Sequence, residues 1–243
     1  IHPSNPAKES TGASYSANKI IEGLDKDHDL TVYCLEPIGE EKSISFETKN
    51  LIKDDRKYRS RTTRLPQNII DSKQELEKFD IIYSYPMTSI RGLGTIAPQI
   101  SAKIAVTLNA YGAICPTNTL NYRESHTSLG SIKCLECVMR QVKNGSTLYS
   151  TPKDFMRGIR SLLRLRNNRS LISNIDLFVA LTQNVKKSYV GAGFPSEKIE
   201  IIPPILDEKF LIEHDSTFEE PFQLLHIGYL KGHKGVDRLI PIA

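Results

Sequence analysis

Residues 103–137 read KIAVTLNAYGAICPTNTLNYRESHTSLGSIKCLEC, and this stretch indicates both the fold and the place of function. It opens as an apolar run, rich in β-branched residues, that ends at Leu108. Such a run is typical of a strand buried on both faces, as in a parallel sheet. The run then breaks at residues 109–112, where side chains at the end of a strand are available to a ligand. We therefore expect functional residues here, and Asn109 and Tyr111 are the candidates.

Elsewhere in the chain, strand patterns alternate with helix patterns. We expect further strands at residues 29–37, 80–85, 174–181 and 198–202. We expect helices at residues 12–24, 73–79, 97–103 and 183–190, and one that begins at residue 152. Residues 38–67 and 87–94 are expected to be surface loops. This order predicts an α/β fold: a Rossmann-like parallel sheet with helices on both faces.

Ligands of such a sheet bind beyond the carboxyl ends of its strands, where Gly12, residues 86–92 and residues 109–112 would lie. A glycine loop that leads into a helix can aim backbone N–H groups at a phosphate, so Gly12 is a candidate binding residue. Alternatively, Gly12 only starts a helix. The strand that should precede this loop is absent, because the chain begins at Ile1 without a methionine. We therefore expect that the sequence lacks its true N-terminus.

The chain is expected to contain one domain and the start of another. Residues 1–205 would form the N-terminal domain, and residues 206–221 an acidic linker. Residues 222–243 repeat the order of strand, glycine-containing loop and helix, so they would begin a second Rossmann-like domain that is cut off at Ala243.

The composition excludes some classes of protein. The 243 residues are 39% hydrophobic and 25% charged, which is ordinary for a soluble globular protein. No apolar run approaches the roughly 18 residues of a membrane span, and the first residues lack the apolar core of a signal peptide. Four cysteines do not resemble a secreted disulfide framework, so we expect a cytoplasmic protein. The net charge of +4 is only a weak indication of acidic partners.

Three of the four cysteines follow the central strand. Cys115, His126, Cys134 and Cys137 would supply three thiolates and one imidazole, a ligand set that suits tetrahedral zinc. The Cys-x-x-Cys pair is the strong part of this signal. A structural zinc would tie down a polar loop, since metal binding contributes to the free energy of folding. Unligated thiols are an equal alternative, and a disulfide or redox role is a third.

A basic amphipathic helix follows the cysteine loop. Thr151 can cap it, and Pro152 suits its first position. At helical spacing, four cations share one face: Lys153, Arg157, Arg160 and Arg164. This face could meet an anionic membrane surface or a phosphorylated acceptor. Alternatively, the helix packs on the core and its cationic face is only solvated. Nucleic acid is disfavoured, because no aromatic side chains alternate with the cations.

These residues together resemble the GT-B fold glycosyltransferases of family 4. The resemblance covers nearly the whole chain, and its most specific part is the block SNIDLFVALTQNVKKSYVGAGFPSEKIEIIP at residues 173–203. It implies a retaining transfer of a sugar from a nucleotide-diphosphate donor to a glycan or lipid-linked acceptor, without a catalytic metal. In the family, two Rossmann-like domains face each other across a cleft, with the acceptor mostly on the first. The resemblance thus implies a polysaccharide-biosynthesis enzyme, with a peripheral position on the inner face of the membrane.

Residue by residue, the resemblance assigns several roles. Gly12 matches a glycine of the acceptor-side loop, and Lys234 matches the lysine that neutralises the donor pyrophosphate. Tyr229 stands where the family usually has arginine. One of the two residues that bind the donor phosphates in the family is therefore replaced by tyrosine. Asn109 stands where many members have a catalytic histidine, and an amide cannot act as a general base. The paired glutamates of the family's second domain would lie beyond Ala243, so we expect this piece alone to be inactive.

The sequence leaves other functions open. Asn109 and Tyr229 favour a non-catalytic domain of the same fold that binds a glycan or nucleotide sugar. A sugar-nucleotide epimerase of related architecture is a third hypothesis. A dinucleotide-dependent enzyme is disfavoured, because no complete Gly-x-Gly-x-x-Gly follows a strand.

Overall fold

The computed structural model describes residues 1–3, 6, 12–35, 46–51, 58–116, 134 and 152–205. The chain divides into two compact units, Ile1–Ile205 and Leu206–Ala243, and all described residues belong to the first. Its strands are β1 (Thr31–Cys34), β2 (Glu47–Asn50), β3 (Ile81–Ser84), β4 (Lys103–Leu108), β5 (Leu177–Ala180) and β6 (Ile199–Ile201). Its helices are α1 (Gly12–Leu24), α2 (Tyr58–Asp71), α3 (Lys73–Leu76), α4 (Ile90–Ile96), α6 (Pro152–Asn167), α7 (Arg169–Ile172) and α8 (Gln183–Gly191). Three 3-10 turns are η1 (Met87–Ser89), η2 (Ala97–Gln99) and η3 (Ser196–Lys198).

All strand pairs of the described unit are parallel. One sheet has the order β3-β4-β5-β6, and β1 pairs with β2 in a second. The first two residues of the chain join these sheets. The His2 N–H donates to the carbonyl oxygen of Tyr33 in β1 (2.8 Å), and the Tyr85 N–H, just after β3, donates to the carbonyl oxygen of Ile1 (3.1 Å). The spatial order is therefore β2, β1, Ile1–His2, β3, β4, β5, β6.

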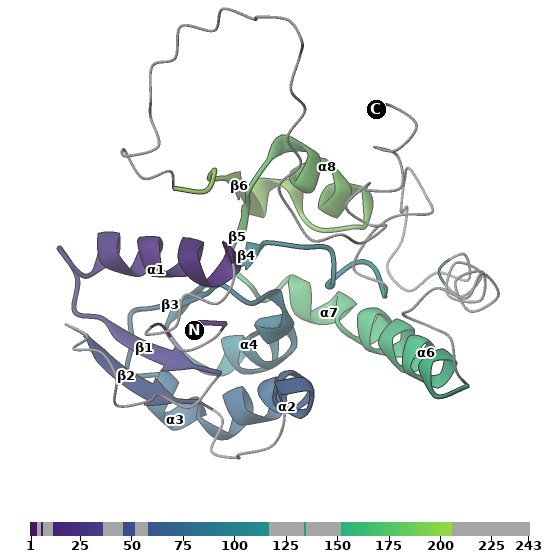
Figure 1. Ribbon diagram of the computed structural model, residues 1–243, viewed down its shortest axis with the longest axis horizontal. Coiled ribbons are helices and arrows are strands. Elements are labelled where there is room, and N and C mark those ends of the chain that lie inside the picture. Colours follow the sequence, from purple (N-terminus) through teal and green to yellow (C-terminus); the bar gives the residue numbers. More distant parts are fainter. Residues whose placement is uncertain are drawn as a thin grey trace, which may run out of the picture. The chain divides into compact units, whose positions relative to one another are not determined.

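Successive strands along the chain are added on one side of Ile1–His2 up to β2, and from β3 onward they are added on the other side. Rossmann-like sheets have the same change, which in this chain lies between Ile1–His2 and β3. The buried apolar residues of α2, α4, α7 and α8, which are labelled in Figure 1, belong to the same hydrophobic core as Val106 and Phe178, which share one face of the sheet. The parallel α/β fold expected from the sequence is confirmed.

β4 lies at the centre of the larger sheet and explains the apolar stretch at residue 103. Val106 and Thr107, which point to opposite faces, are both completely buried. Its neighbour β5 is equally buried, and the ring of Phe178 packs edge-on against Phe194 with centroids 5.0 Å apart. Burying a side chain of this size contributes about 2–3 kcal/mol. The expectation of a strand covered on both faces is therefore confirmed.

The sequence-based prediction of two loops is wrong. Residues 38–67 contain β2 and the first part of α2, and residues 87–94 contain η1 and most of α4. The helix expected at residues 97–103 is only the turn η2. In α2, Leu65 and Ile69 are one helical turn apart and completely buried, although Pro66 and several cations surround them in the sequence. Tertiary packing on these two residues outweighs the poor helix propensity of the segment.

The expected start of α8 is confirmed in detail. Thr182 is extended, and its hydroxyl accepts the N–H of Val185 at 3.2 Å, which satisfies one of the first N–H groups of the helix. The described helices include none that combines the length and the apolar character needed to cross a bilayer.

Candidate functional site

The carboxyl edge of the sheet carries the residues that the sequence singles out. After β4 ends at Leu108, the chain makes one tight turn, in which the Tyr111 carbonyl oxygen accepts the N–H groups of Ile114 (3.0 Å) and Cys115 (2.7 Å). The Tyr189 hydroxyl of α8 donates to the carbonyl oxygen of Ala110 at 2.5 Å. The backbone that carries Asn109 is therefore fixed from two sides.

Asn109 itself is half-buried at this fixed position. Within the described residues, its side-chain amide makes no hydrogen bond. A carboxamide offers two donors and one acceptor oxygen, so it can hydrogen-bond a sugar hydroxyl or a phosphate. Tyr111 is also half-buried, and its ring packs against the hydrophobic core. The structure thus makes Asn109 the available polar group and Tyr111 a partly structural one.

The end of β3 and the turn η1 that follows it hold two serines that the sequence patterns did not single out. The Ser84 hydroxyl donates to that of Ser89 at 2.7 Å, and Ser89 donates to the Pro86 carbonyl oxygen at 2.8 Å. Both hydroxyls are completely buried. This network closes the loop on itself, so these serines shape the carboxyl edge rather than contact a ligand. No sequence pattern distinguishes them from surface serines.

Gly12 is the first residue of α1 and is exposed. A Cβ added to it would meet no heavy atom within 4 Å, so packing does not require glycine here. Because α1 follows the Ile1–His2 segment of a parallel sheet, its start lies at the same edge as the end of β4. A helix N-terminus at this edge can accept an anion.

The basic helix is confirmed as α6, which begins at Pro152. Leu162 and Leu165 are buried, whereas Arg160 and Leu163 are exposed, so the helix has one covered face. The other three cations, Lys153, Arg157 and Arg164, lie on described backbone, but their side chains are outside the described residues.

The other candidates are only partly described. Cys115 and Cys134 are both buried, and thiols are suitable zinc ligands. His126 and Cys137 fall outside the described residues, and the residues that are described contain no group of three or more potential metal ligands. The four-residue zinc set therefore stays a prediction. Tyr229 and Lys234 also lie outside the described residues.

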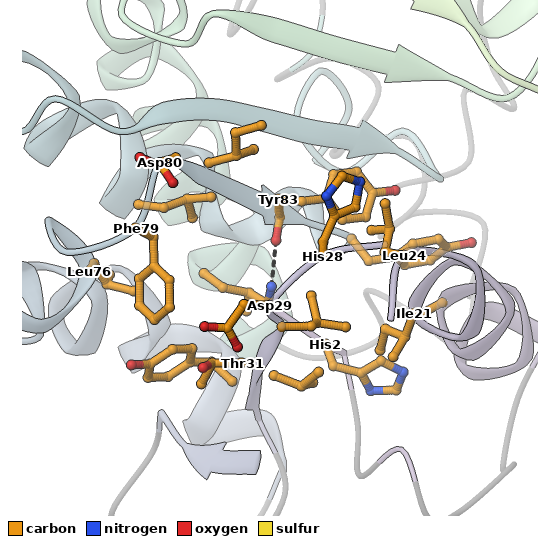
Figure 2. A pocket seen from close by; sticks show the side chains of 18 of the residues that line it. His2, Ile21, Leu24, His28, Asp29, Thr31, Leu76, Phe79, Asp80 and Tyr83 are labelled. Atoms are coloured by element: carbon orange, nitrogen blue, oxygen red, sulfur yellow. Dashed lines mark hydrogen bonds between the residues drawn. The ribbon is translucent and has the colours of Figure 1, made fainter. Parts of the chain in front are cut away.

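A cavity of about 470 Å³ lies at the opposite, amino-terminal edge of the sheet. It separates the first halves of β1 and β3, and Ile1 and His2 close one end of it. Figure 2 shows Ile21 and Leu24 of α1 on one side of it, and Leu76 and Phe79 on the other.

Comparison with protein-family models finds no match to this chain, and comparison with curated proteins finds none either.

Proposed function

We propose that this chain is the acceptor-side part of a retaining glycosyltransferase that transfers a sugar from a nucleotide-diphosphate donor to a glycan or lipid-linked acceptor. Catalysis would need no metal. The proposal rests on the resemblance of the sequence to GT-B glycosyltransferases of family 4 and on one structural observation. That observation is the unengaged amide of Asn109, held at the carboxyl edge of a parallel sheet.

The edge suits a polar ligand for two reasons. The strand order reverses between Ile1–His2 and β3, and α/β proteins bind ligands at such a point, outside the carboxyl ends of the strands. The start of α1 at the exposed Gly12 would add backbone N–H donors on the same edge. In the proposed reaction, Asn109 and the α1 start bind the acceptor, and Tyr111 forms part of the wall.

Lys234 is proposed to neutralise the charge that develops on the leaving diphosphate. A compact ammonium group suits this role, because it provides a point charge where the transition state becomes more negative. Tyr229 would supply a hydroxyl to the same phosphates. The cations Lys153, Arg157, Arg160 and Arg164 of α6 are proposed to hold the enzyme against an anionic membrane surface that carries the acceptor.

A second candidate is a binding domain of the same fold without activity. The amide of Asn109 favours it, because a carboxamide cannot act as a general acid or base at neutral pH. Such a domain would bind a nucleotide sugar or glycan through the same edge and leave it unchanged.

The two candidates are separated by incubating the protein, in a form that includes a complete second domain, with a panel of UDP- and GDP-sugars. The enzyme is supported by release of the nucleoside diphosphate, with Lys234→Met at least about 100-fold slower. The neighbouring Lys231→Met is the matched control and should keep most of the activity. Binding without release supports the binding domain. Neither binding nor release, with Lys234→Met indistinguishable from the unchanged protein, contradicts both.

A further inference from the structure

Helix α6 carries large apolar side chains on its exposed face as well as on its covered one. Met156 is 49% exposed and Leu163 is 56% exposed, whereas Leu162 and Leu165 are buried. Met156 and Leu163 are seven residues apart, which is about two helical turns, so they lie on one line along the helix. A single exposed apolar side chain is ordinary, but two on one line form a small apolar surface.

Exposed cations accompany this pair. Arg160 follows Met156 by four residues and precedes Leu163 by three, so it lies between them on the same side of the helix. Arg166 is exposed about one turn beyond Leu163. Within the described residues, no ion pair neutralises either guanidinium. These four residues, Met156, Arg160, Leu163 and Arg166, form the α6 stripe, which combines apolar side chains with uncompensated positive charge.

The covered face of α6 holds the α6 stripe in an outward direction. Leu165 is completely buried, and at 3.6 residues per turn it lies about 180° around the helix from Met156. Leu162 is buried beside it, and the helix leads into α7, whose Ile172 belongs to the hydrophobic core. The helix is therefore attached to the unit through one side, and the α6 stripe faces away from it.

An anionic bilayer surface matches the α6 stripe in both of its properties. Interfacial helices place apolar side chains at the boundary between headgroups and acyl chains, while arginine side chains extend to the phosphates. A second copy of the chain fits less well, because pairing two such stripes brings their guanidinium groups together. Interfaces with other proteins depend mainly on aromatic anchors such as tryptophan and tyrosine, and the α6 stripe contains no aromatic residue.

We propose that Met156 and Leu163 insert into the headgroup boundary of an anionic bilayer, with Arg160 and Arg166 on the lipid phosphates. The inference rests on the membrane contact proposed above for the cations of α6, and it adds that this contact is partly hydrophobic. Because Leu165 holds the opposite side of the helix in the core, only the outer side chains enter the bilayer. The insertion is therefore shallow, and binding is reversible and depends on the cations as well.

The chain contains no tryptophan, so a single introduced tryptophan reports its own surroundings. Leu163→Trp is mixed with vesicles of phosphatidylserine and phosphatidylcholine, with and without bromine atoms on the acyl chains. We expect its emission to move to shorter wavelength, and bromine to quench it at least about twofold more strongly than it quenches Ile202→Trp. Ile202 is 52% exposed and lies outside α6, so it is the matched control. Met156→Trp repeats the measurement at the other end of the α6 stripe, in case Leu163→Trp does not fold.

Sedimentation with the same vesicles measures how much the apolar side chains contribute to binding. Met156→Ser combined with Leu163→Ser should weaken binding at least about tenfold, because binding scales with the apolar area that is buried. Val190→Ser combined with Ile202→Ser removes the same number of exposed apolar side chains from other elements, and it should change binding by less than about twofold.

Several results would overturn the proposal. If the protein sediments with vesicles but the emission of both tryptophan variants stays unchanged, the cations contact headgroups only, and the charge-based contact of the proposed function stands alone. If no form sediments, that contact is contradicted together with the insertion. A dimer that Met156→Ser with Leu163→Ser dissociates would assign the α6 stripe to a second copy of the chain. An emission shift that soluble polyglutamate produces as fully as the vesicles would assign it to an acidic partner protein.

Discussion

The hydroxyl of Tyr189 and the carbonyl oxygen of Ala110, 79 positions apart in the sequence, are joined by a hydrogen bond of 2.5 Å. Tyr189 is completely buried, and its ring packs edge-on against Phe194 with centroids 4.8 Å apart. Through this bond, helix α8 fixes the backbone immediately after Asn109.

Tyr189→Phe removes this bond and leaves the Ala110 carbonyl without its partner. We expect the free energy of unfolding to fall by about 1–2 kcal/mol, measured by urea denaturation. Val190→Ala on the exposed side of the same helix should change it by less than about 0.5 kcal/mol. Equal stability of Tyr189→Phe and the unchanged protein would show that the bond contributes nothing.

Gly94 allows helices α4 and α7 to touch. A Cβ at this position would lie 2.6 Å from the carbonyl oxygen of Leu171 and 2.9 Å from its Cβ. Backbone cannot move aside cheaply, so Gly94→Ala should destabilise the protein by about 1–3 kcal/mol. Gly23→Ala is the control, because a Cβ there meets nothing within 4 Å and alanine favours the helix. We expect thermal unfolding to show a lower midpoint for the first and an unchanged or higher one for the second.

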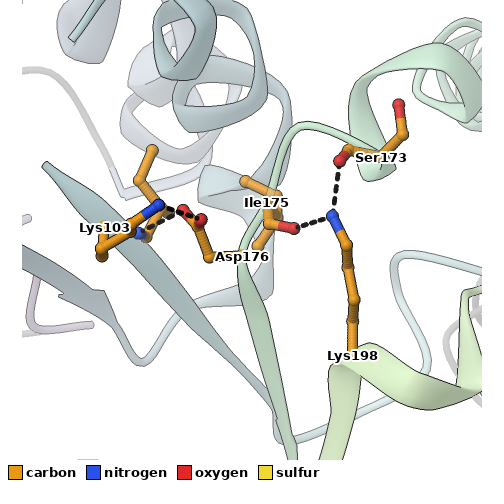
Figure 3. Close-up of polar contacts among 6 residues, drawn as sticks. Lys103, Ser173, Ile175, Asp176 and Lys198 are labelled. Atoms are coloured by element: carbon orange, nitrogen blue, oxygen red, sulfur yellow. Dashed lines mark hydrogen bonds and ion pairs between the residues drawn. The ribbon is translucent and has the colours of Figure 1, made fainter. Parts of the chain in front are cut away.

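Asp176 makes the stability depend on pH. Its carboxylate accepts the Ile104 N–H (2.9 Å) and the Lys103 ammonium (3.2 Å), as Figure 3 shows. Partial burial raises the pKa, but the Ile104 and Lys103 contacts outweigh it, so the pKa lies below its usual value of 3.8. The stabilisation is therefore present above about pH 4 and is lost as the pH falls through the lowered value.

Asp176→Asn should cost about 1 kcal/mol at pH 7, at the low end for a charged hydrogen bond because the side chain is 39% exposed. The difference from the unchanged protein should shrink towards zero as the pH falls through the lowered pKa of Asp176, in urea denaturation at several pH values. Asp27→Asn controls for the loss of one exposed carboxylate. A difference that stays constant across the whole pH range would contradict the assignment.

The cationic face of α6 is expected to bind anionic membranes. Reversing Arg157, Arg160 and Arg164 to glutamate should weaken sedimentation with phosphatidylserine vesicles at least tenfold, because each basic residue near such a surface contributes about 1 kcal/mol. Lys26, Arg91 and Lys187 are exposed cations on other elements, and reversing all three gives the same change in net charge. Equal losses in both triple variants would indicate an effect of net charge alone, and unchanged sedimentation would end the membrane proposal.

The cysteine loop is expected to hold zinc. Elemental analysis of the purified protein should find about one equivalent, and Cys134→Ser should lose it. Cys34→Ser is the control: Cys34 is buried inside β1 and belongs to no proposed ligand set. If the protein contains no zinc after purification in buffer that contains zinc, the prediction is contradicted, and these thiols only contribute to packing.

The sequence predicts the buried strands well and the polar or glycine-containing elements poorly. β4 and β5 are apolar runs, so their burial is visible in the residues themselves. β2 reads ETKN and carries no such signal; among the described residues it pairs with β1 alone. It is held partly by Lys49, which forms ion pairs with Glu47 and Glu75, a contact that depends on the folded neighbour.

The glycines of α4 led to a wrong prediction of a loop. Gly92 and Gly94 indicate a loop by composition, but in the structure each lies where another backbone comes close, at Pro66 and at Leu171. Glycine is required at these positions because of tertiary contacts, and the local sequence does not reveal such contacts. The same holds for the candidate site: Asn109 could be placed at a strand end, but the contact from Tyr189 that fixes its backbone could not.

The register that pairs Ala105 with Leu177 places consecutive strands of the sheet far apart in the sequence. A ribosome therefore releases β4 well before its partner exists, and until β5 emerges one edge of an apolar strand has no neighbour. Loop closure over such a separation also slows folding. The newly made chain should consequently depend on chaperones during this interval, and residues 103–108 are where aggregation would begin.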